Sequence, residues 1–145
     1  MKKMMCLLIC MLMAAVSVSA QADKIVGTYK VVRNGVTSKV KIFKYNNGYR
    51  AQVTWVDNLK KADGTIRLDE KNPDKNKRNV RADQIVLIDK VTYDADDKEW
   101  SNGKIYDPTN GKTYKVKLWF DSDKVLKMRG YVGIFYDTSE WTKIQ

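Results

Sequence analysis

The sequence contains no histidine, and its only two cysteines, Cys6 and Cys10, lie within the first ten residues. Histidine is the commonest general base and the commonest side-chain ligand of transition metals, so its absence excludes histidine-based triads and the usual zinc and haem centres. Once the first residues are removed, no thiol remains for a disulfide, a metal thiolate or a nucleophile. The composition therefore predicts neither a metal nor a cofactor, and it argues against an enzyme.

Long apolar runs are missing as well, except at the amino terminus. Two lysines precede an uncharged stretch over residues 4–16, which is too short to cross a membrane. The small residues that end at Ala20 match a signal peptidase site, and those that end at Ala22 offer a second one. We predict a signal peptide over residues 1–20, export to the periplasm or to the outside of the cell, and one mature domain over residues 21–145.

Acidic residues are few relative to basic ones. The formal charge is +10 for the whole chain and +8 for residues 21–145, which lack Lys2 and Lys3. This excess suits an anionic envelope component as a partner, or simply a soluble surface. Most lysines alternate with apolar residues, as on the wet face of strands, and no one-sided basic cluster indicates nucleic acid binding. We interpret the charge mainly as a source of solubility and keep an anionic envelope component as a candidate partner.

Apolar and polar residues alternate with a period of two along most of the chain, and no stretch has convincing helical periodicity. Turn pairs such as Asn34-Gly35 separate the expected strands. A closed barrel leaves no open sheet edge, which suits a small exported protein. The predicted fold class is all-β, an antiparallel barrel of about eight strands. The strands are expected at residues 25–32, 39–44, 49–55, 84–93, 99–106, 114–120, 125–132 and 134–144.

The alternation stops between residues 58 and 83, which are rich in charge and poor in large apolar side chains. A long polar stretch of this kind is typical of a functional loop or of a mobile one. Asp69, Asn72 and Arg78 are its candidate ligand-binding residues, because a carboxylate, an amide and a guanidinium together suit a polar ligand. The alternative is a solvated loop with local ion pairs, and no calcium-loop spacing is present.

The segment over residues 106–114, YDPTNGKTY, is the densest in turn signals and polar groups. Its proline and its Asn110-Gly111 pair are typical of a tight connection between two strands, and a hairpin is the favoured interpretation. A turn does not require a cation between two aromatic residues, so the position of Lys112 between two tyrosines is left unexplained. The alternative is a binding rim at the mouth of a barrel, formed by Tyr106, Asp107, Asn110, Lys112 and Tyr114.

Aromatic residues are plentiful, with four tryptophans and eight tyrosines. They suit stacking on sugars, lipids or bases, but the same set is typical of an ordinary barrel core. Trp55, which alternation places on one face with Val53, and Trp100 are the candidate ligand contacts. Trp119 is out of phase with its apolar neighbours, and we expect it to face solvent or a partner.

Taken together, these segments resemble an exported bacterial family known as domain of unknown function 2147. The resemblance implies an antiparallel, lipocalin-like (calycin-type) barrel and no established activity. It also adds Arg129 and Tyr131 to the candidate ligand-binding residues. The likeness covers the whole mature chain and is carried by Gly27-Thr28-Tyr29, residues 69–73, Trp100-Ser101-Asn102-Gly103, residues 106–114, Arg129-Gly130-Tyr131 and Trp141-Thr142-Lys143.

The chain departs from the usual lipocalin-like pattern at the end of the barrel that such proteins close. Tyr29 stands where the opening motif normally has a tryptophan, and Lys143 stands near the place of an arginine that often stacks on that tryptophan. These departures weaken the case for a cation–π lock at the closed end of this barrel.

Three functions remain open at this point. The favoured one is a monomeric or weakly associated barrel that binds a small hydrophobic or sugar-like ligand. The second is an interaction protein with a filled barrel, whose basic surface docks on an anionic envelope component. The third is a hydrolase, which requires two of the carboxylates of Glu99, Asp107 and Asp137 in one pocket.

Overall fold

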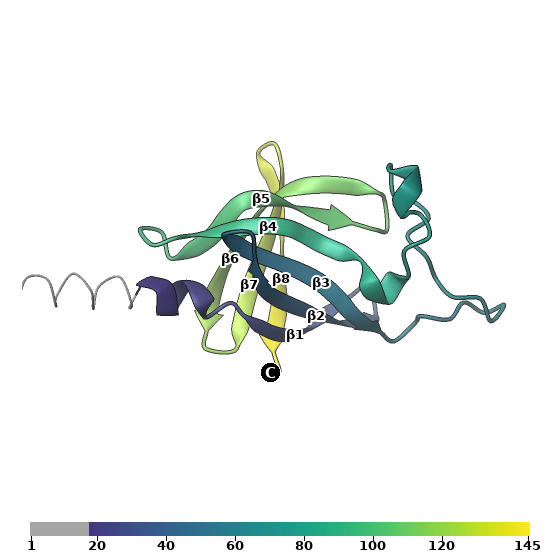
Figure 1. The fold of residues 1–145 in the computed structure, drawn as a ribbon, viewed down its shortest axis with the longest axis horizontal. Helices are drawn as coiled ribbons and strands as arrows, with labels where there is room; N and C mark the ends of the chain where they lie inside the picture. The colour runs from purple at the N-terminus through teal and green to yellow at the C-terminus, as the bar shows by residue number, and fades with distance from the viewer. Residues whose placement is uncertain (1–17) are drawn as a thin grey trace, which may run out of the picture.

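The computed structural model describes residues 18–145 and shows eight antiparallel strands closed into one barrel (Figure 1). Each strand pairs with the next along the chain, and β1 also pairs with β8, which closes the sheet. This confirms the predicted fold class, and the structure has a strand close to each expected range. The strands are β1 (Gly27–Arg33), β2 (Val36–Tyr45), β3 (Gly48–Val56), β4 (Val86–Asp94), β5 (Glu99–Asp107), β6 (Lys112–Ser122), β7 (Val125–Val132) and β8 (Phe135–Lys143).

The segment predicted as a signal peptide lies outside the described residues, except for residues 18–20, which are helical together with residues 21–23. No helix in the described part of the chain is long and apolar enough to cross a membrane. The eight strands and the buried apolar side chains, from Ile25 to Trp141, all lie within residues 21–145. A chain that begins at Gln21 therefore contains the sheet ladders and the core of the barrel.

Two of the connections follow the turn signals of the sequence. Asn34 and Gly35, between β1 and β2, have φ of 51° and 77°, the left-handed conformation that these residue types tolerate best. Between β5 and β6, Gly111 has φ of 73°, and its amide donates a hydrogen bond of 2.8 Å to the carbonyl of Asp107. The hairpin interpretation of residues 106–114 therefore explains the backbone of that segment.

Trp55 lies outside the barrel, although strict alternation places it on the same face as Val53. The pairing of β2 with β3 shifts at Lys39 and Val40: Lys39 pairs with Trp55, and the next residue, Val40, pairs with Val53. The extra residue on β3 is a β-bulge, which reverses the facing of the residues beyond it. Trp55 is 44% exposed, and the ammonium of Lys39 lies 5.4 Å from its ring centroid.

Tyr29 fills the centre of the barrel end that lies next to the amino-terminal residues. It is fully buried, its ring centroid is 6.4 Å from that of Trp141, and its hydroxyl donates a hydrogen bond of 2.8 Å to the carbonyl of Ile25. The ammonium of Lys143 donates to the carbonyl of Lys24 at 2.7 Å, and burial lowers the pKa of Lys143. Ring packing and side-chain hydrogen bonds to backbone carbonyls therefore close this end.

Residues 21–25 are tied to the same end of the barrel by side chains of several further strands. Trp100 Nε1 donates a hydrogen bond of 3.1 Å to the carbonyl of Ala22. The carboxylate of Asp23 accepts from Tyr49 Oη at 2.6 Å and from Lys44 Nζ at 2.8 Å. The Lys44 and Tyr49 hydrogen bonds hold the pKa of Asp23 below its ordinary value. The segment that precedes β1 is therefore part of the closed end.

The polar stretch between β3 and β4 is a structured loop at the opposite end of the barrel, beside the β5–β6 connection (Figure 1). Its backbone pairs with itself at two bridges, Lys60 with Ile66 and Leu68 with Arg81. Two short 3-10 helices, η1 (Lys75–Lys77) and η2 (Ala82–Gln84), complete it. Asp74 caps η1 by accepting from the amide of Asn76 at 3.0 Å. The stretch therefore has its own backbone pairing and a defined position at this end of the barrel.

Candidate ligand-binding site

A cavity of about 460 Å³ extends into the barrel from the end that carries the long loop. Its inner wall is apolar and includes buried residues of four segments, such as Val31 of β1, Val53 of β3, Ile105 of β5 and Trp141 of β8. Its outer wall is polar and partly exposed, for example at Arg33. The cavity therefore joins solvent to the apolar interior.

Ser139 and Trp141 are two residues apart on β8 and therefore face the same side of the sheet, and both line the cavity. Among the described residues, Ser139 Oγ and Trp141 Nε1 are buried side-chain atoms without a hydrogen-bond partner. An unpaired buried hydroxyl adds no stability, so an apolar side chain at position 139 loses no hydrogen bond within the protein. Position 139 is therefore a place where the cavity can be filled without breaking a contact.

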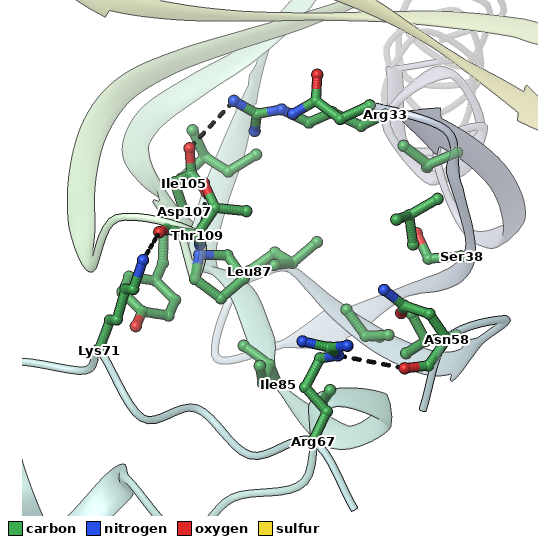
Figure 2. A pocket seen from close by; sticks show the side chains of 18 of the residues that line it. Arg33, Ser38, Asn58, Arg67, Lys71, Ile85, Leu87, Ile105, Asp107 and Thr109 are labelled. Carbon is green, nitrogen blue, oxygen red and sulfur yellow. Dashed lines mark hydrogen bonds and ion pairs between the residues drawn. The ribbon is translucent and has the colours of Figure 1, made fainter. Parts of the chain in front are cut away.

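Four cations, Arg33, Lys61, Arg67 and Lys71, line the mouth of the cavity, against two carboxylates. Both carboxylates are already paired: Asp107 accepts from the Arg33 guanidinium at 3.0 Å, and Glu70 accepts from Lys61 at 2.9 Å. Figure 2 shows the Arg33 and Arg67 side chains on opposite sides of the opening.

The other two cations of the mouth, Arg67 and Lys71, donate to backbone carbonyls. Arg67 Nε donates to the carbonyl of Asn58 at 3.2 Å, and Lys71 Nζ donates to that of Thr109 at 2.8 Å (Figure 2). Within residues 18–145, neither forms an ion pair with a carboxylate. The residues that line the cavity therefore include two more cations than carboxylates, beside an apolar interior.

Asp69 holds the long loop against β5. Its side chain is buried and accepts from Tyr106 Oη at 2.7 Å and from Asn72 Nδ2 at 2.8 Å. Burial, followed by the hydrogen bond to Asp69, raises the pKa of Tyr106 well above its ordinary value, so the hydroxyl stays protonated and remains a donor. The two residues form a buried clamp between loop and barrel.

Gly111 brings the loop and the β5–β6 hairpin into backbone contact. A Cβ atom built on Gly111 lies 2.1 Å from the carbonyl oxygen of Lys71, a distance that real side chains do not occupy. On the other side of this contact, Lys71 Nζ donates to the carbonyl of Thr109, next to the turn. The glycine is thus required by its positive φ and by the close approach of the loop. Residues 106–111 form the surface on which the loop docks.

A second hollow of about 350 Å³ adjoins the cavity, and both are lined by Arg33, Ile105, Tyr106, Asp107 and Met128. It lies toward the β7–β8 connection and includes Tyr114, whose hydroxyl accepts from Asn110 Nδ2 at 2.8 Å, and Asp137. Both Asp107 and Asp137 line this hollow, but Asp107 is held by Arg33 and by Thr109, whose amide and hydroxyl donate at 2.9 and 2.6 Å. Its hydrogen bonds therefore suit a turn anchor rather than a proton donor.

The candidate residues from the sequence separate into two groups. One group is at the mouth: Tyr106 and Asp107 line both hollows, Asn110 and Tyr114 line the second, and Asp69 and Asn72 fix the loop. The other group lies elsewhere. Trp100 belongs to the core at the closed end, and Trp55 is on the outer face. Arg78 donates to the carbonyl of Asn72 on the surface of the loop, and Lys112 is exposed and lines neither hollow. Arg129 and Tyr131 face outward from β7.

Sequence reasoning missed the rim cations and the inner wall of the cavity. Arg33, Arg67 and Lys71 resemble other surface cations until the fold brings them together at one opening. Ser139 carries a signal that was available, because alternation from Trp141 places it on the inward face of β8. A polar residue in phase with a core tryptophan is a usable indicator of a cavity wall.

Comparison with known proteins agrees with this architecture. A search of the solved structures finds protein HP1028 from the human pathogen Helicobacter pylori, described as belonging to the lipocalin family, with a TM-score of 0.66. It is 23% identical, and the alignment covers 83% of each chain, so the likeness shows a shared lipocalin-like barrel and no function. No curated protein matches the chain. The family profile described as "Uncharacterized protein conserved in bacteria (DUF2147)" matches residues 27–143, and the chain belongs to this family.

Proposed function

We propose that the protein binds a small amphipathic ligand, whose apolar body lies in the barrel and whose anionic head group lies at the mouth. The observation that carries this proposal is the cavity of about 460 Å³, with an apolar inner wall and a rim that carries four cations. Pockets that hold drug-sized ligands have volumes of roughly 300–1,000 Å³ and combine apolar walls with a few polar groups. The cavity has the size and the distribution of polarity of such a pocket.

The charge of the rim favours an anionic head group over a neutral or sugar-like one. Arg67 and Lys71 donate only to backbone carbonyls, so an incoming carboxylate or phosphate finds two cations that are not already neutralised. Hydrogen bonds between ionised partners are about twice as strong as neutral ones. A neutral ligand of the same shape makes only the apolar contacts, and we expect it to bind more weakly.

We also propose that residues 1–20 direct export and that cleavage follows Ala20. The closed end of the barrel supports this position, because Trp100 donates to the carbonyl of Ala22 and Tyr49 donates to Asp23. Cleavage after Ala20 leaves both contacts in the mature chain, whereas cleavage after Ala22 removes the first. The protein then acts outside the cytoplasm, in the periplasm or beyond it, as a monomer or weak oligomer.

A displacement assay tests ligand binding directly. A fluorescent fatty acid is bound to residues 21–145 and displaced by palmitate, by the corresponding neutral alcohol, or by a sugar. We expect palmitate to displace the probe at lower concentration than the alcohol, and the sugar to have no effect. Failure of all apolar probes to bind contradicts the proposal, and equal displacement by acid and alcohol contradicts the role of the charged rim.

Two pairs of variants separate the cavity from the surface. Ser139→Phe fills the cavity, and Thr113→Phe adds the same side chain at an exposed site that lines neither hollow. Ser139→Phe should abolish binding with a change in stability below about 1 kcal/mol, since the ring enters empty space and the hydroxyl has no partner. Arg67→Gln with Lys71→Gln should weaken palmitate more than the alcohol, because any loosening of the loop affects both ligands and the lost charge affects only palmitate, whereas Lys112→Gln should weaken neither. Retained affinity in Ser139→Phe places the ligand elsewhere.

A further inference from the structure

The tip of the β7–β8 hairpin is the most exposed apolar feature of the described chain. Ile134, Phe135 and Tyr136 are 88%, 74% and 60% exposed, and Val132 is 58% exposed. Between them, Gly133 has φ of 58°, and no atom lies within 4 Å of the position that a Cβ would take there, so the turn stands free of the barrel. Exposed apolar residues that gather in one place indicate an interaction site, whereas scattered ones do not.

This tip lies at the same end of the barrel as the ligand cavity. Val132, Phe135 and Tyr136 line the second hollow together with Arg33 and Asp107, which also belong to the mouth of the first cavity. In Figure 1 the tip is the yellow loop that connects β7 to β8 and projects beyond the neighbouring strands. Whatever the tip contacts therefore lies beside the mouth.

Aromatic and basic side chains continue from the tip along the outer face of β6, β7 and β8. The guanidinium of Arg129 lies 4.1 Å from the ring centroid of Tyr136 and 4.9 Å from that of Trp119. The ring of Tyr131 is 6.1 Å from that of Tyr136, and Tyr131 pairs across the sheet with the exposed Lys115. Trp119 therefore belongs to an outward-facing group, as its phase in the sequence indicates.

Two cations of this face are free of carboxylates. Within residues 18–145, Lys117 pairs with Glu99 and Lys127 pairs with Glu140, whereas Arg129 and Lys115 form no ion pair. The net charge of +8 for residues 21–145 adds a long-range attraction to any anionic surface. An occupant of this face is expected to be negatively charged and to accept apolar side chains.

We propose that the β7–β8 tip docks on an anionic lipid bilayer. Ile134 and Phe135 enter the boundary between head groups and acyl chains, Tyr136 and Tyr131 lie at the level of the head groups, and Arg129 and Lys115 contact lipid phosphates. Apolar residues backed by aromatic residues and then by cations match the order of layers in a membrane interface. A protein partner requires no such order, and a second copy of this chain carries the same positive charge and is repelled. Membrane docking goes beyond ligand binding and holds whether or not the cavity is occupied.

Co-sedimentation with vesicles tests this docking on residues 21–145, which contain the whole barrel. We expect binding to vesicles that contain phosphatidylglycerol, weak binding to pure phosphatidylcholine, and partial loss of binding at high salt because only the phosphate contacts are screened. Ile134→Ser with Phe135→Ser should weaken binding at least about tenfold, since two large apolar side chains no longer leave water. The control Trp55→Ser, which removes an exposed aromatic residue far from the tip in the sheet, should leave binding unchanged.

A fluorescent label reports where the membrane contact occurs. Residues 21–145 contain no cysteine, so Ile134→Cys and the control Ala95→Cys, which lies in the exposed β4–β5 connection at the closed end, each provide one site for an environment-sensitive dye. The emission of the dye at position 134 should shift to the blue on anionic vesicles, and the dye at position 95 should not respond. Unchanged vesicle binding in the double serine variant, or an unresponsive dye at position 134 in sedimented protein, overturns the proposal. A dimer that depends on the tip, without vesicle binding, also overturns it and assigns the tip to a second copy.

Discussion

The contact between Gly111 and the carbonyl of Lys71 allows the docking of the long loop to be measured by a single substitution. Gly111→Ala introduces a Cβ atom 2.1 Å from that oxygen, so the loop backbone must move away from the β5–β6 hairpin. The same substitution at Gly35 provides the control. Gly35 has φ of 77°, close to the 73° of Gly111, but no atom lies within 4 Å of its Cβ position.

The difference between the two alanine variants isolates the cost of undocking the loop. An alanine in the left-handed conformation costs about 1–2 kcal/mol, and this cost is common to both positions. Only Gly111→Ala also disturbs the hydrogen bond between Lys71 and Thr109, worth about 0.5–1.5 kcal/mol, and loosens the contacts around it. We expect Gly35→Ala to lower the free energy of unfolding by about 1–2 kcal/mol, and Gly111→Ala to lower it by about 2–4 kcal/mol.

Urea unfolding followed by tryptophan fluorescence gives the two free energies of unfolding. Amide hydrogen exchange locates the change, because Gly111→Ala should increase exchange at Asp69, whose amide donates to the carbonyl of Val80 within the loop. Exchange at Tyr29 and Trp100, which are buried at the closed end of the barrel, should stay as in the unsubstituted protein. Equal destabilisation by the two variants, or an unchanged exchange rate in the loop, refutes the inference that the hairpin holds the loop.

Three further results are expected. Tyr106→Phe leaves the buried Asp69 carboxylate with one donor fewer and should destabilise the protein by about 1–3 kcal/mol in urea unfolding, with no change if the clamp is unimportant. The lowered pKa of Asp23 means that its contribution to stability is present above the ordinary carboxyl pKa of 3.8 and is lost as the pH falls through the still lower folded value, so Asp23→Asn should flatten the acid limb of a stability curve. A chain that begins at Asp23 loses the carbonyl that Trp100 donates to and should melt below a chain that begins at Gln21.

The strands and the turns could be predicted from the sequence because their signals are local. Period-two alternation extends over whole strands, and the Asn34-Gly35 pair by itself indicates a turn with positive φ, which the structure has. The bulge on β3 has no comparable signal, since it depends on the pairing with β2, and it moved Trp55 from the expected inner face to the outer one. Trp100 was equally ambiguous, because a ligand contact and a core residue share the same pattern.

The site was only half predictable for a related reason. Tyr106 and Asp107 could be predicted as candidates because a turn over residues 106–114 does not require the cation and the two aromatic residues of that segment. Both candidates line the cavity. Arg67 is held at the mouth by the carbonyl of Asn58 within the loop, whereas Lys71 reaches the mouth because the loop folds back onto the β5–β6 hairpin. That contact joins residues nearly forty positions apart, as in the hydrogen bond of Lys71 to Thr109 with a separation of 38 residues, and no local pattern indicates it.

The docked loop and the exposed tip both border the mouth of the cavity, so the proposed membrane docking and the proposed ligand binding involve the same end of the barrel. Arg33 and Asp107 line the cavity and also the hollow that contains Phe135 and Tyr136. Docking of the tip on a bilayer therefore turns the mouth toward the lipid surface, where an amphipathic ligand with an anionic head group is concentrated. On this geometry, vesicles should speed the transfer of a fluorescent fatty acid into the barrel. The double serine variant of Ile134 and Phe135 should lose that acceleration and keep its affinity for free ligand, whereas Ser139→Phe should lose the affinity and keep the vesicle binding.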